Sequence, residues 1–226
     1  MFGKLSHKSR GRGNMVYLRF FMLAVVLLGG LTGCWGRGVS PMEMAAHMAP
    51  PPGPPPSEQA ALTPEQRVIA EALKQNGLRG QNPTVILVRK KSRRLTTYRG
   101  LAAIKTYPIV LGSNSTADKM CQGDRCTPEG VYRVVDKYPH PKWTYFILLD
   151  YPNAFNWAKF DRAKKAGRLP PNAEIGGAIG IHGTEDDYRN MRGENWTLGC
   201  ISLMNRHVEE IYPLVNPGTL VVIQRD

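Results

Sequence analysis

Two residues in the C-terminal part of the chain, His182 and Cys200, are of the types that together carry out nucleophilic catalysis. Cys200 lies in "NWTLGCISLMN", directly after Gly199, and His182 ends the apolar run "GAIGIH". A thiol becomes an effective nucleophile when a base takes its proton, and backbone amides around Gly199 and Cys200 could stabilise an oxyanion. The alternative is a structural role, because free cysteines often pack in cores as small apolar residues.

The N-terminal residues predict export, which decides how the cysteines are used. Residues 1–33 contain five basic residues, no acidic residue and the apolar run "FFMLAVVLLGGL". This run has the length of a signal-peptide core and is too short for a comfortable transmembrane helix. It ends in "LTGC", which resembles a bacterial lipobox and implies cleavage before Cys34 and diacylation of its sulfur. We interpret residues 1–33 as a lipoprotein signal peptide; an ordinary signal peptide and an uncleaved anchor are the alternatives.

The charge of the chain narrows the class of partner. The formal net charge is +12, and removing the five positive charges of the leader leaves +7 (12 − 5) on the mature part. A basic surface can attract nucleic acid, but export and the lack of a Lys/Arg run with interleaved aromatics argue against that partner. A carboxylate-rich polymer outside the cytoplasm, such as cell-wall peptide, fits better.

The four cysteines divide by position. Cys34 is assigned to the lipid. Cys121 and Cys126, in "CQGDRC", are close enough for a loop disulfide, which an exported protein can form. A metal site there is less favoured because no His or second Cys pair lies nearby. Cys200 remains as a single thiol, a pattern that points to a reactive cysteine.

The organisation along the chain predicts one folded domain behind a spacer. Residues 34–60 form a proline-rich linker, and residues 61–80 hold one short helix with Thr63 as N-cap and Gln66 completing a capping box. Residues 81–226 are expected to be mainly β with a few helices, as a β-sandwich or a partly closed barrel. The predicted strands are 84–90, 94–100, 103–112, 130–138, 144–152, 177–183 and a closing strand within 216–224.

A second helix is predicted where "NRHVEEIYPLV" has apolar residues at helical spacing. Asn205 is its expected N-cap. Cys200 lies shortly before this helix, whose N-terminus would favour the thiolate form of the cysteine.

Several pieces, in order, resemble the L,D-transpeptidase family with the YkuD-type catalytic domain. "IHGT…TLGCISLMN" is similar to the family signature of His-Gly, a loop, and Ser/Thr-x-Gly-Cys followed by an apolar residue. "RLTTYRGLAAIKTYPIVLG" resembles the opening strands, "TPEGVYRV" a middle segment and "NPGTLVVI" the closing strand. The resemblance covers residues 83–226 and implies a YkuD-like fold.

The resemblance also implies a reaction. The Cys200 thiolate attacks the carbonyl of the third residue of a peptidoglycan stem peptide, and the terminal D-Ala leaves with a proton from His182. An amine then resolves the thioester into a 3–3 cross-link or an attached protein. Gly199, Thr197 and Gly183 are expected to support the oxyanion and the substrate, and for Thr197 a role as a turn residue is the alternative of equal weight. The resemblance implies no metal and no organic cofactor. The implied location is the cell envelope, with a lipid anchor on the periplasmic side of the inner or outer membrane.

Other residues of this segment leave the function less defined. Leu198 stands where many family members have His or Arg, and Ser202 stands where many have Arg or Asn. "NWTLGCIS" and "YPNAFNW" are closer to a subgroup that includes hydrolases. A hydrolase that cuts L,D cross-links or releases wall-bound lipoprotein is therefore the alternative, and a non-catalytic wall-binding lipoprotein is the alternative of another class. A sortase is disfavoured because sortases place their histidine much further from the cysteine.

Four further side chains are weighed without an assigned function. Trp196 and Tyr145 could line the peptide groove, although a core role is at least as plausible for either. His140 and His207 are interpreted as surface or packing histidines.

The lipobox interpretation predicts that Cys34→Ser abolishes incorporation of labelled lipid and releases the protein from the membrane fraction. The physical reason is that the acyl chains on the sulfur would be the anchor once the leader is cleaved. The measurement is membrane fractionation with metabolic lipid labelling. A variant that stays in the membrane at the wild-type size would instead indicate an uncleaved apolar helix.

Overall fold

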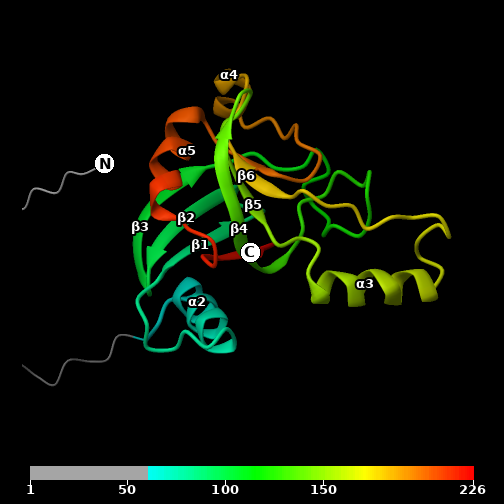
Figure 1. Cartoon of the computed structure of the whole chain (residues 1–226), viewed down its shortest axis with the longest axis horizontal. Helices are drawn as coiled ribbons and strands as arrows, with labels where there is room; N and C mark the ends of the chain where they lie inside the picture. The colour runs from blue at the N-terminus through cyan, green and yellow to red at the C-terminus, as the bar shows by residue number, and fades with distance from the viewer. Residues whose placement is uncertain (1–60) are drawn as a thin grey trace, which may run out of the picture. The chain divides into compact units, whose positions relative to one another are not determined.

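The computed structural model describes residues 61–226. They form one eight-stranded mixed sheet in the order β3-β2-β1-β8-β4-β5-β6-β7, which curls into a half-barrel (Figure 1). The predicted mainly β, partly closed barrel is therefore confirmed. The strands are β1 (Thr84–Arg89), β2 (Arg94–Arg99), β3 (Ala102–Pro108), β4 (Gly130–His140), β5 (Thr144–Leu149), β6 (Gly180–His182), β7 (Ile201–Ser202) and β8 (Leu220–Gln224).

Strand β4 is the element that carries the sheet around its curl. Its first residues, Gly130 to Arg133, pair with β8, and its later residues pair with β5 as far as His140. A register shift between Val134 and Asp136 separates the two halves, and such a bulge bends a strand and increases its twist. The bend lets one sheet enclose a core on its concave side.

The centre of the sheet is apolar on both faces. β1 and β8 run parallel to each other, and residues 84–88 and 220–223 are all buried. Continuous apolar runs of this kind are typical of strands covered on both sides. One face belongs to the main core, which includes Ile86, Val221 and Ile201. The other face packs against the first helix.

That first helix, α2 (Pro64–Gln75), forms where the sequence predicted it. Thr63 and Gln66 make the reciprocal capping-box hydrogen bonds, and Pro64 occupies the first turn. Ile69 and Leu73 are buried against β1 and β8. The helix therefore belongs to the folded domain and closes the outer face of the sheet.

The second predicted helix is present, but its capping residue is not the expected one. Helix α5 (Asn205–Ile211) has Met204 at the N-cap, with no side-chain cap bond. The Asn205 side chain instead accepts a hydrogen bond from the Thr184 amide (2.9 Å) and donates to the Thr184 carbonyl (2.9 Å). Asn205 therefore ties the chain after β6 to the start of α5. A short 3-10 helix, η1 (Tyr212–Leu214), follows.

Two further helices are not predicted by the sequence patterns. Helix α3 (Ala154–Lys165) is capped by Asn153, whose side chain accepts from the Phe155 and Asn156 amides. Figure 1 shows α3 lying to one side of the sheet. Helix α4 (Asp187–Met191) is a single short turn in the loop between β6 and β7.

Some predictions fall outside the described residues. The signal peptide (1–33), Cys34 and the linker (34–60) are among them, so they stay predictions. None of the helices within residues 61–226 is long and apolar enough to cross a membrane. Within the same range no cluster of three or more His, Cys, Asp or Glu could hold a metal ion.

The packing of α2 predicts that Ile69→Ala destabilises the whole domain by about 2–5 kcal/mol, the usual cost of truncating a fully buried aliphatic side chain. Ile69 has no solvent exposure. Chemical denaturation of the full chain measures the effect. Arg67→Ala, on the exposed face of the same helix, should change the unfolding free energy by no more than about 0.5 kcal/mol. Equal effects of the two variants would mean that α2 does not contribute its apolar face to the core.

Candidate active site

Two short parallel strands bring the chemically important segments together. β6 pairs with β7 through Ile181 opposite Ile201 and His182 opposite Ser202. Cys200 directly precedes β7, and His182 ends β6. The loop between the strands is long, but their pairing places the histidine and the cysteine at one end of the sheet.

Both residues line one cavity of about 1060 Å³. Aromatic, glycine and basic residues make up much of the rest of its wall. The lining residues are Lys119, Gln122, Gly123, Arg125, Tyr138, His140, Trp143, Phe146, Leu148, Gly176, Gly177, Ala178, Ile179, His182, Trp196, Thr197, Leu198 and Cys200. The thiol and the imidazole can thus act on a single bound substrate.

The tautomer of His182 follows from its hydrogen bond. Nδ1 lies 2.7 Å from the carbonyl oxygen of Gly183. A carbonyl oxygen only accepts, so Nδ1 carries the proton and the neutral ring keeps its lone pair on Nε2. Nε2 is therefore the basic nitrogen of this site.

A chain of hydrogen bonds supports the carbonyl that holds the histidine. Ser202 Oγ also donates to the Gly183 oxygen (2.9 Å), Asn190 Nδ2 donates to Ser202 Oγ (2.8 Å), and Trp196 Nε1 donates to Asn190 Oδ1 (2.8 Å). Ser202, one of the two departures from the common family pattern, thus has a structural reason for being a small hydroxyl residue. Such a network fixes an imidazole more firmly than a single contact does.

Aromatic rings enclose the imidazole. Trp143 stacks on His182 with ring centroids 4.3 Å apart, Phe146 lies parallel at 5.6 Å, and Trp196 meets the ring edge-on at 5.8 Å. His182 is only 1 % exposed. This burial, opposed by the Gly183 hydrogen bond and assisted by the charge of nearby His140, lowers the pKa of His182 to about 4. The imidazole is accordingly neutral near pH 7.

Cys200 is a protonated thiol at the same pH. Its side chain is partly exposed, and its Sγ lies 3.6 Å from the Ala178 carbonyl oxygen. Dense surroundings raise the pKa of Cys200 through desolvation, while a backbone hydrogen bond from Gly180 and the charge of Lys119 act in the opposite direction. The expectation that the helix near Asn205 would favour the thiolate stays a prediction: β7 separates Cys200 from α5, and desolvation is the largest influence on the pKa of Cys200.

Gly199 and Thr197 shape the turn that presents the cysteine. Gly199 has φ +141°, and a Cβ there would lie 2.7 Å from the Cys126 carbonyl oxygen, so only glycine fits. The Thr197 hydroxyl donates to the Cys200 carbonyl (2.7 Å) and accepts from the Gly199 amide (3.1 Å). The Gly199 amide is therefore not free for an oxyanion, contrary to expectation. Within residues 61–226, the Cys200 amide has no hydrogen-bond partner.

Some of the remaining residues singled out in the sequence line the cavity, and others lie outside it. Trp196 lines the cavity, whereas Tyr145 stacks on Tyr212 (4.0 Å) away from it. His207 packs on Tyr107, as interpreted. His140 also packs on an aromatic ring, because it stacks on Trp143 (4.4 Å), and it does so at the cavity. Gly183 contributes through its carbonyl to the histidine rather than to an oxyanion.

Sequence reasoning missed Trp143 and Asn190. Trp143 lies in the turn between β4 and β5 and Asn190 lies in helix α4, and neither segment carries a catalytic motif.

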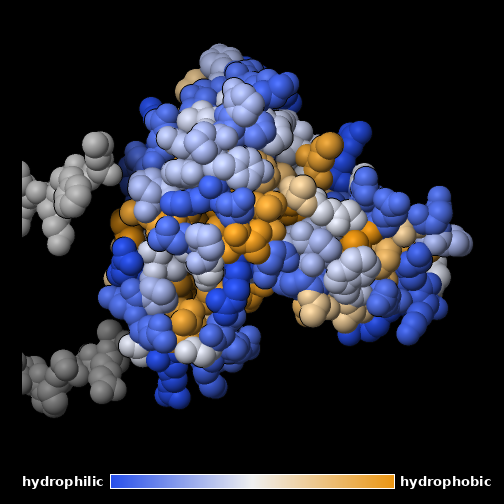
Figure 2. Space-filling model, in the orientation of Figure 1, coloured by the Kyte–Doolittle hydropathy of each residue, from blue (hydrophilic) through white to orange (hydrophobic). Residues whose placement is uncertain are grey.

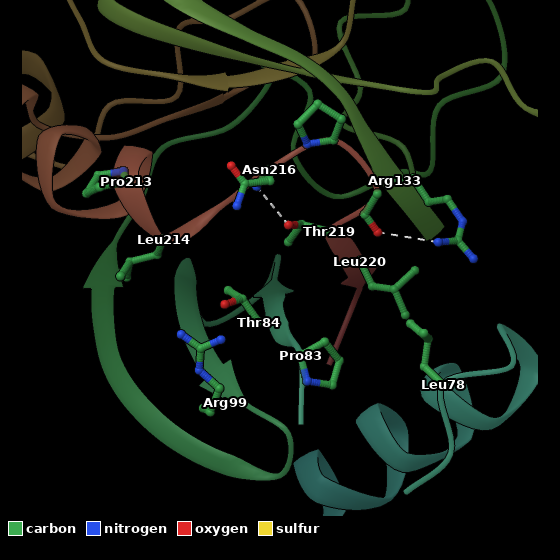
Figure 3. Close-up of a pocket in the computed structure, with 12 residues that line it drawn as sticks. Leu78, Pro83, Thr84, Arg99, Arg133, Pro213, Leu214, Asn216, Thr219 and Leu220 are labelled. Atoms are coloured by element: carbon green, nitrogen blue, oxygen red, sulfur yellow. Dashed lines mark hydrogen bonds between the residues drawn. The ribbon is translucent and has the colours of Figure 1, made fainter. Parts of the chain in front are cut away.

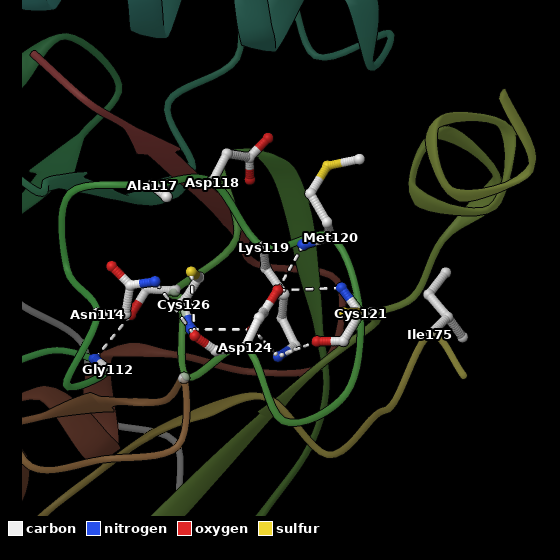
Figure 4. A network of polar contacts seen from close by, with 12 residues as sticks. Gly112, Asn114, Ala117, Asp118, Lys119, Met120, Cys121, Asp124, Cys126 and Ile175 are labelled. Carbon is white, nitrogen blue, oxygen red and sulfur yellow. Dashed lines mark hydrogen bonds and ion pairs between the residues drawn. The ribbon is translucent and has the colours of Figure 1, made fainter. Parts of the chain in front are cut away.

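The predicted disulfide between Cys121 and Cys126 is not present in this structure, where both are free thiols. The loop that joins them is held by the Asp124 carboxylate, which accepts hydrogen bonds from the amides of Met120, Cys121 and Cys126 and from Lys119 Nζ (Figure 4). These donors keep the pKa of Asp124 below its usual value, although burial opposes them. Asp124 therefore holds this loop in shape while both thiols are reduced. The disulfide stays a prediction for the oxidised protein.

A second cavity, of about 460 Å³, lies away from these residues (Figure 3). It is formed by the chain after α2, the start of β1 and the turn before β8, and it contains neither His182 nor Cys200. The chemistry of the His–Cys pair is therefore confined to the larger cavity.

Comparison with known proteins decides the family. The model of the YkuD family, described as the L,D-transpeptidase catalytic domain, matches residues 83–223. The chain belongs to the L,D-transpeptidase catalytic domain family. The matched residues include His182, Cys200 and the loop between them.

Relatives of this transpeptidase domain are distant. "Putative L,D-transpeptidase YafK" of Escherichia coli K12 is 28% identical over 146 residues, which make up 62% of this chain and 50% of that protein. The protein of the same name from Escherichia coli O157:H7 matches equally. This chain thus spans about half the length of the curated relatives it matches.

Solved structures with a similar transpeptidase domain are also diverged. Bd1075 of Bdellovibrio bacteriovorus has a TM-score of 0.46 at 24% identity, over 64% of this chain and 49% of that one. Pgp2 of Campylobacter jejuni, a helical cell shape determining protein, has a TM-score of 0.47 at 23% identity, over 65% and 49%.

The burial of His182 predicts a pH dependence of stability. Below about pH 6.5 the unfolded chain protonates this residue, but the folded domain does so only near pH 4, so stability falls as the pH is lowered across this window. At about 1.4 kcal/mol for each pH unit, the contribution lost is roughly 3.5 kcal/mol. Denaturation curves of wild type and His182→Asn from pH 7 to 4 measure it. Parallel loss in both proteins would contradict the assigned neutral state, because His207 and the carboxylates are common to both.

Proposed function

We propose that this protein is an exported cell-wall L,D-transpeptidase that forms a thioester between Cys200 and the peptidoglycan stem peptide. The observation that carries the proposal is the bond from His182 Nδ1 to the Gly183 carbonyl, which leaves Nε2 as a base on the cavity that also holds the thiol. Membership of the L,D-transpeptidase catalytic domain family supports this reaction class for the pair.

The acylation step follows from the protonation states. The Cys200 sulfur attacks the carbonyl carbon of the third stem residue while its proton passes to His182 Nε2. The oxygen becomes an oxyanion, to which the Cys200 amide donates a hydrogen bond. The C–N bond then breaks, the terminal D-Ala amine takes the proton from Nε2, and a thioester remains.

The deacylation step uses the same groups in reverse. An acceptor amine, from a second stem or from a protein, attacks the thioester carbonyl and gives its proton to Nε2. The C–S bond breaks, the sulfur recovers the proton, and a new amide is released. The products are a 3–3 cross-link or a wall-attached protein; with water as acceptor the same site would act as a hydrolase.

The surroundings of the pair suit a peptide. Trp196 and Trp143 offer flat apolar walls, and Leu198, directly before Gly199, is 74 % exposed at the cavity rim. Apolar walls with a few polar groups are typical of ligand sites. A lipid on Cys34, with residues 34–60 as spacer, would hold this cavity near the wall of the cell.

The test is digestion of purified sacculi, or of isolated disaccharide tetrapeptides, with the full chain and its variants, followed by mass analysis. Wild type should produce 3–3 linked dimers and an acylated Cys200. Cys200→Ala should keep the fold and lose all turnover. His182→Ala should lose about 10²–10⁴-fold in rate, the typical contribution of general acid–base catalysis.

Cys121→Ala is the matched control, because Cys121 is a second partly buried thiol that does not line the cavity. It should retain wild-type turnover and the acylated Cys200. Shortened stems or lost cross-links, without new dimers, would reassign the protein as a hydrolase. An unreactive wild-type thiol, together with a badly destabilised Cys200→Ala, would support the structural role and defeat the proposal.

A further inference from the structure

The active-site cavity has a one-sided charge. Among the described residues that line it, Lys119 and Arg125 are the two with a full charge, and both are cationic. No Asp or Glu is part of this lining. The wall of the cavity therefore offers donors to a negatively charged group on the substrate and no carboxylate to repel it.

Lys119 differs from the other buried lysine in how its ammonium is used. Lys90, 2 % exposed, donates to three acceptors: the carbonyls of Ala117 and Thr127 and the carboxylate of Glu129. Lys119, 4 % exposed, donates to the Asp124 carboxylate (2.8 Å) and the Cys121 carbonyl (3.1 Å). An ammonium has three N–H donors. Within residues 61–226 the third donor of Lys119 has no protein acceptor, and this lysine, unlike Lys90, lines the cavity.

Asp124 does not require Lys119 for its own hydrogen bonding. Both of its oxygens already accept backbone amides, from Met120, Cys121 and Cys126 (Figure 4). What the carboxylate achieves is to hold the loop 119–126 in shape and to fix the position of the ammonium. A buried charge fixed in this way, with one donor left over, is preorganised for a ligand.

Arg125 adds a second donor from the same loop. Its backbone has φ +57°, a conformation that costs a non-glycine residue free energy and is found preferentially at ligand sites. Its carbonyl is bound by the Asn114 amide (3.1 Å), while its guanidinium makes no ion pair within the described part of the chain. The exposed guanidinium is thus available at the cavity wall, beside the glycine turn at Gly123.

We propose that Lys119 and Arg125 form a subsite for a free carboxylate of the acyl donor, next to Cys200. The inference rests on the proposed function, which supplies the acyl donor. Two carboxylates of a stem peptide have the required chemistry: that of the terminal D-Ala, and that on the side chain of a diaminopimelate at the third position. Charge-assisted hydrogen bonds from the ammonium and the guanidinium would hold either of them and orient the scissile amide toward the thiol.

The kinetic experiment compares three synthetic stem tetrapeptides with the full-length protein. One has both carboxylates free, one has a terminal carboxamide, and one has an amidated third residue. Wild type should lose at least about tenfold in kcat/KM on one of the two amidated donors, the effect of removing a charge-assisted hydrogen bond. The donor that suffers the loss identifies the carboxylate.

Variants of the two cationic residues test whether they cause the preference for the free-acid donor over the amidated donors. Lys119→Met and Arg125→Gln should each raise KM for the free acid, and the preference over the amide should shrink toward one. Arg125→Gln should change kcat little, whereas Lys119→Met should also lower kcat, because it removes a charge that lowers the pKa of Cys200. Lys159→Met is the matched control: it removes a lysine paired with Asp118 beside the same loop (2.6 Å) but outside the cavity, and it should keep the wild-type preference. Arg125 is exposed, so its variant tests the subsite even where Lys119→Met does not fold.

A binding arm separates failure of the subsite from failure of the proposed function. Equilibrium binding of the free acid and of both amides is measured on Cys200→Ala, with and without Lys119→Met or Arg125→Gln. Binding that depends on one carboxylate and on these cations supports the subsite even if wild type turns over no stem peptide. Equal affinity for the free acid and both amides, or an affinity for the free acid that neither variant lowers, overturns it even if wild type is an active transpeptidase.

Discussion

The hydrogen bond from His182 Nδ1 to the Gly183 carbonyl is the contact on which the rest of the site depends. It selects the tautomer in which Nε2 is basic, and it does so with a backbone atom that cannot ionise. The carbonyl needs its own support, from Ser202, and the backbone must pass through a narrow space. A Cβ on Gly183 would lie 2.5 Å from the Trp143 carbonyl and 2.3 Å from Asn205 Oδ1. Glycine is therefore required there for close packing.

These constraints join elements that are far apart in the sequence. Asn205, at the start of α5, binds both backbone groups of Thr184, and the Trp143 carbonyl accepts the Gly183 amide (3.0 Å). Trp143 also stacks on the imidazole that Gly183 orients. The turn between β4 and β5, the end of β6 and the start of α5 thus form one rigid frame. Fold and site are coupled, because loosening any of these segments would move the base.

The sequence allowed prediction of those parts of this arrangement that rest on local patterns. Seven of the eight strands follow alternating or continuous apolar runs, and α2 follows its capping box, so these elements were expected; the two-residue strand β7 (Ile201–Ser202) is too short for such a run and was not predicted. His182 and Cys200 stand out by residue type and by their motif.

The Asn205 side chain was misassigned because an asparagine before an apolar helix face looks like a cap, while its actual partner, Thr184, is brought close only by the pairing of β6 with β7. Trp143, Asn190 and Asp124 act through tertiary contacts, which a local pattern cannot contain. Gly199 and Gly183 were expected to support an oxyanion. Only the three-dimensional structure shows that the Gly199 amide is bound by Thr197 and that the Gly183 carbonyl is bound by His182.

The enclosure that orients the imidazole also limits how the reaction can begin. Burial lowers the pKa of His182 to about 4 and raises the pKa of Cys200 above its ordinary value of 9.0. Moving the proton from sulfur to nitrogen before substrate arrives is unfavourable, because the two pKa shifts both disfavour the charged forms of the pair. A thiolate–imidazolium pair is therefore not the resting state of this site. Attack on a carbonyl removes the need for a free thiolate, because the negative charge passes on to the substrate oxygen as the proton leaves the sulfur. In the proposed reaction, proton transfer coupled to attack therefore suits a neutral, buried imidazole beside a partly exposed, protonated thiol.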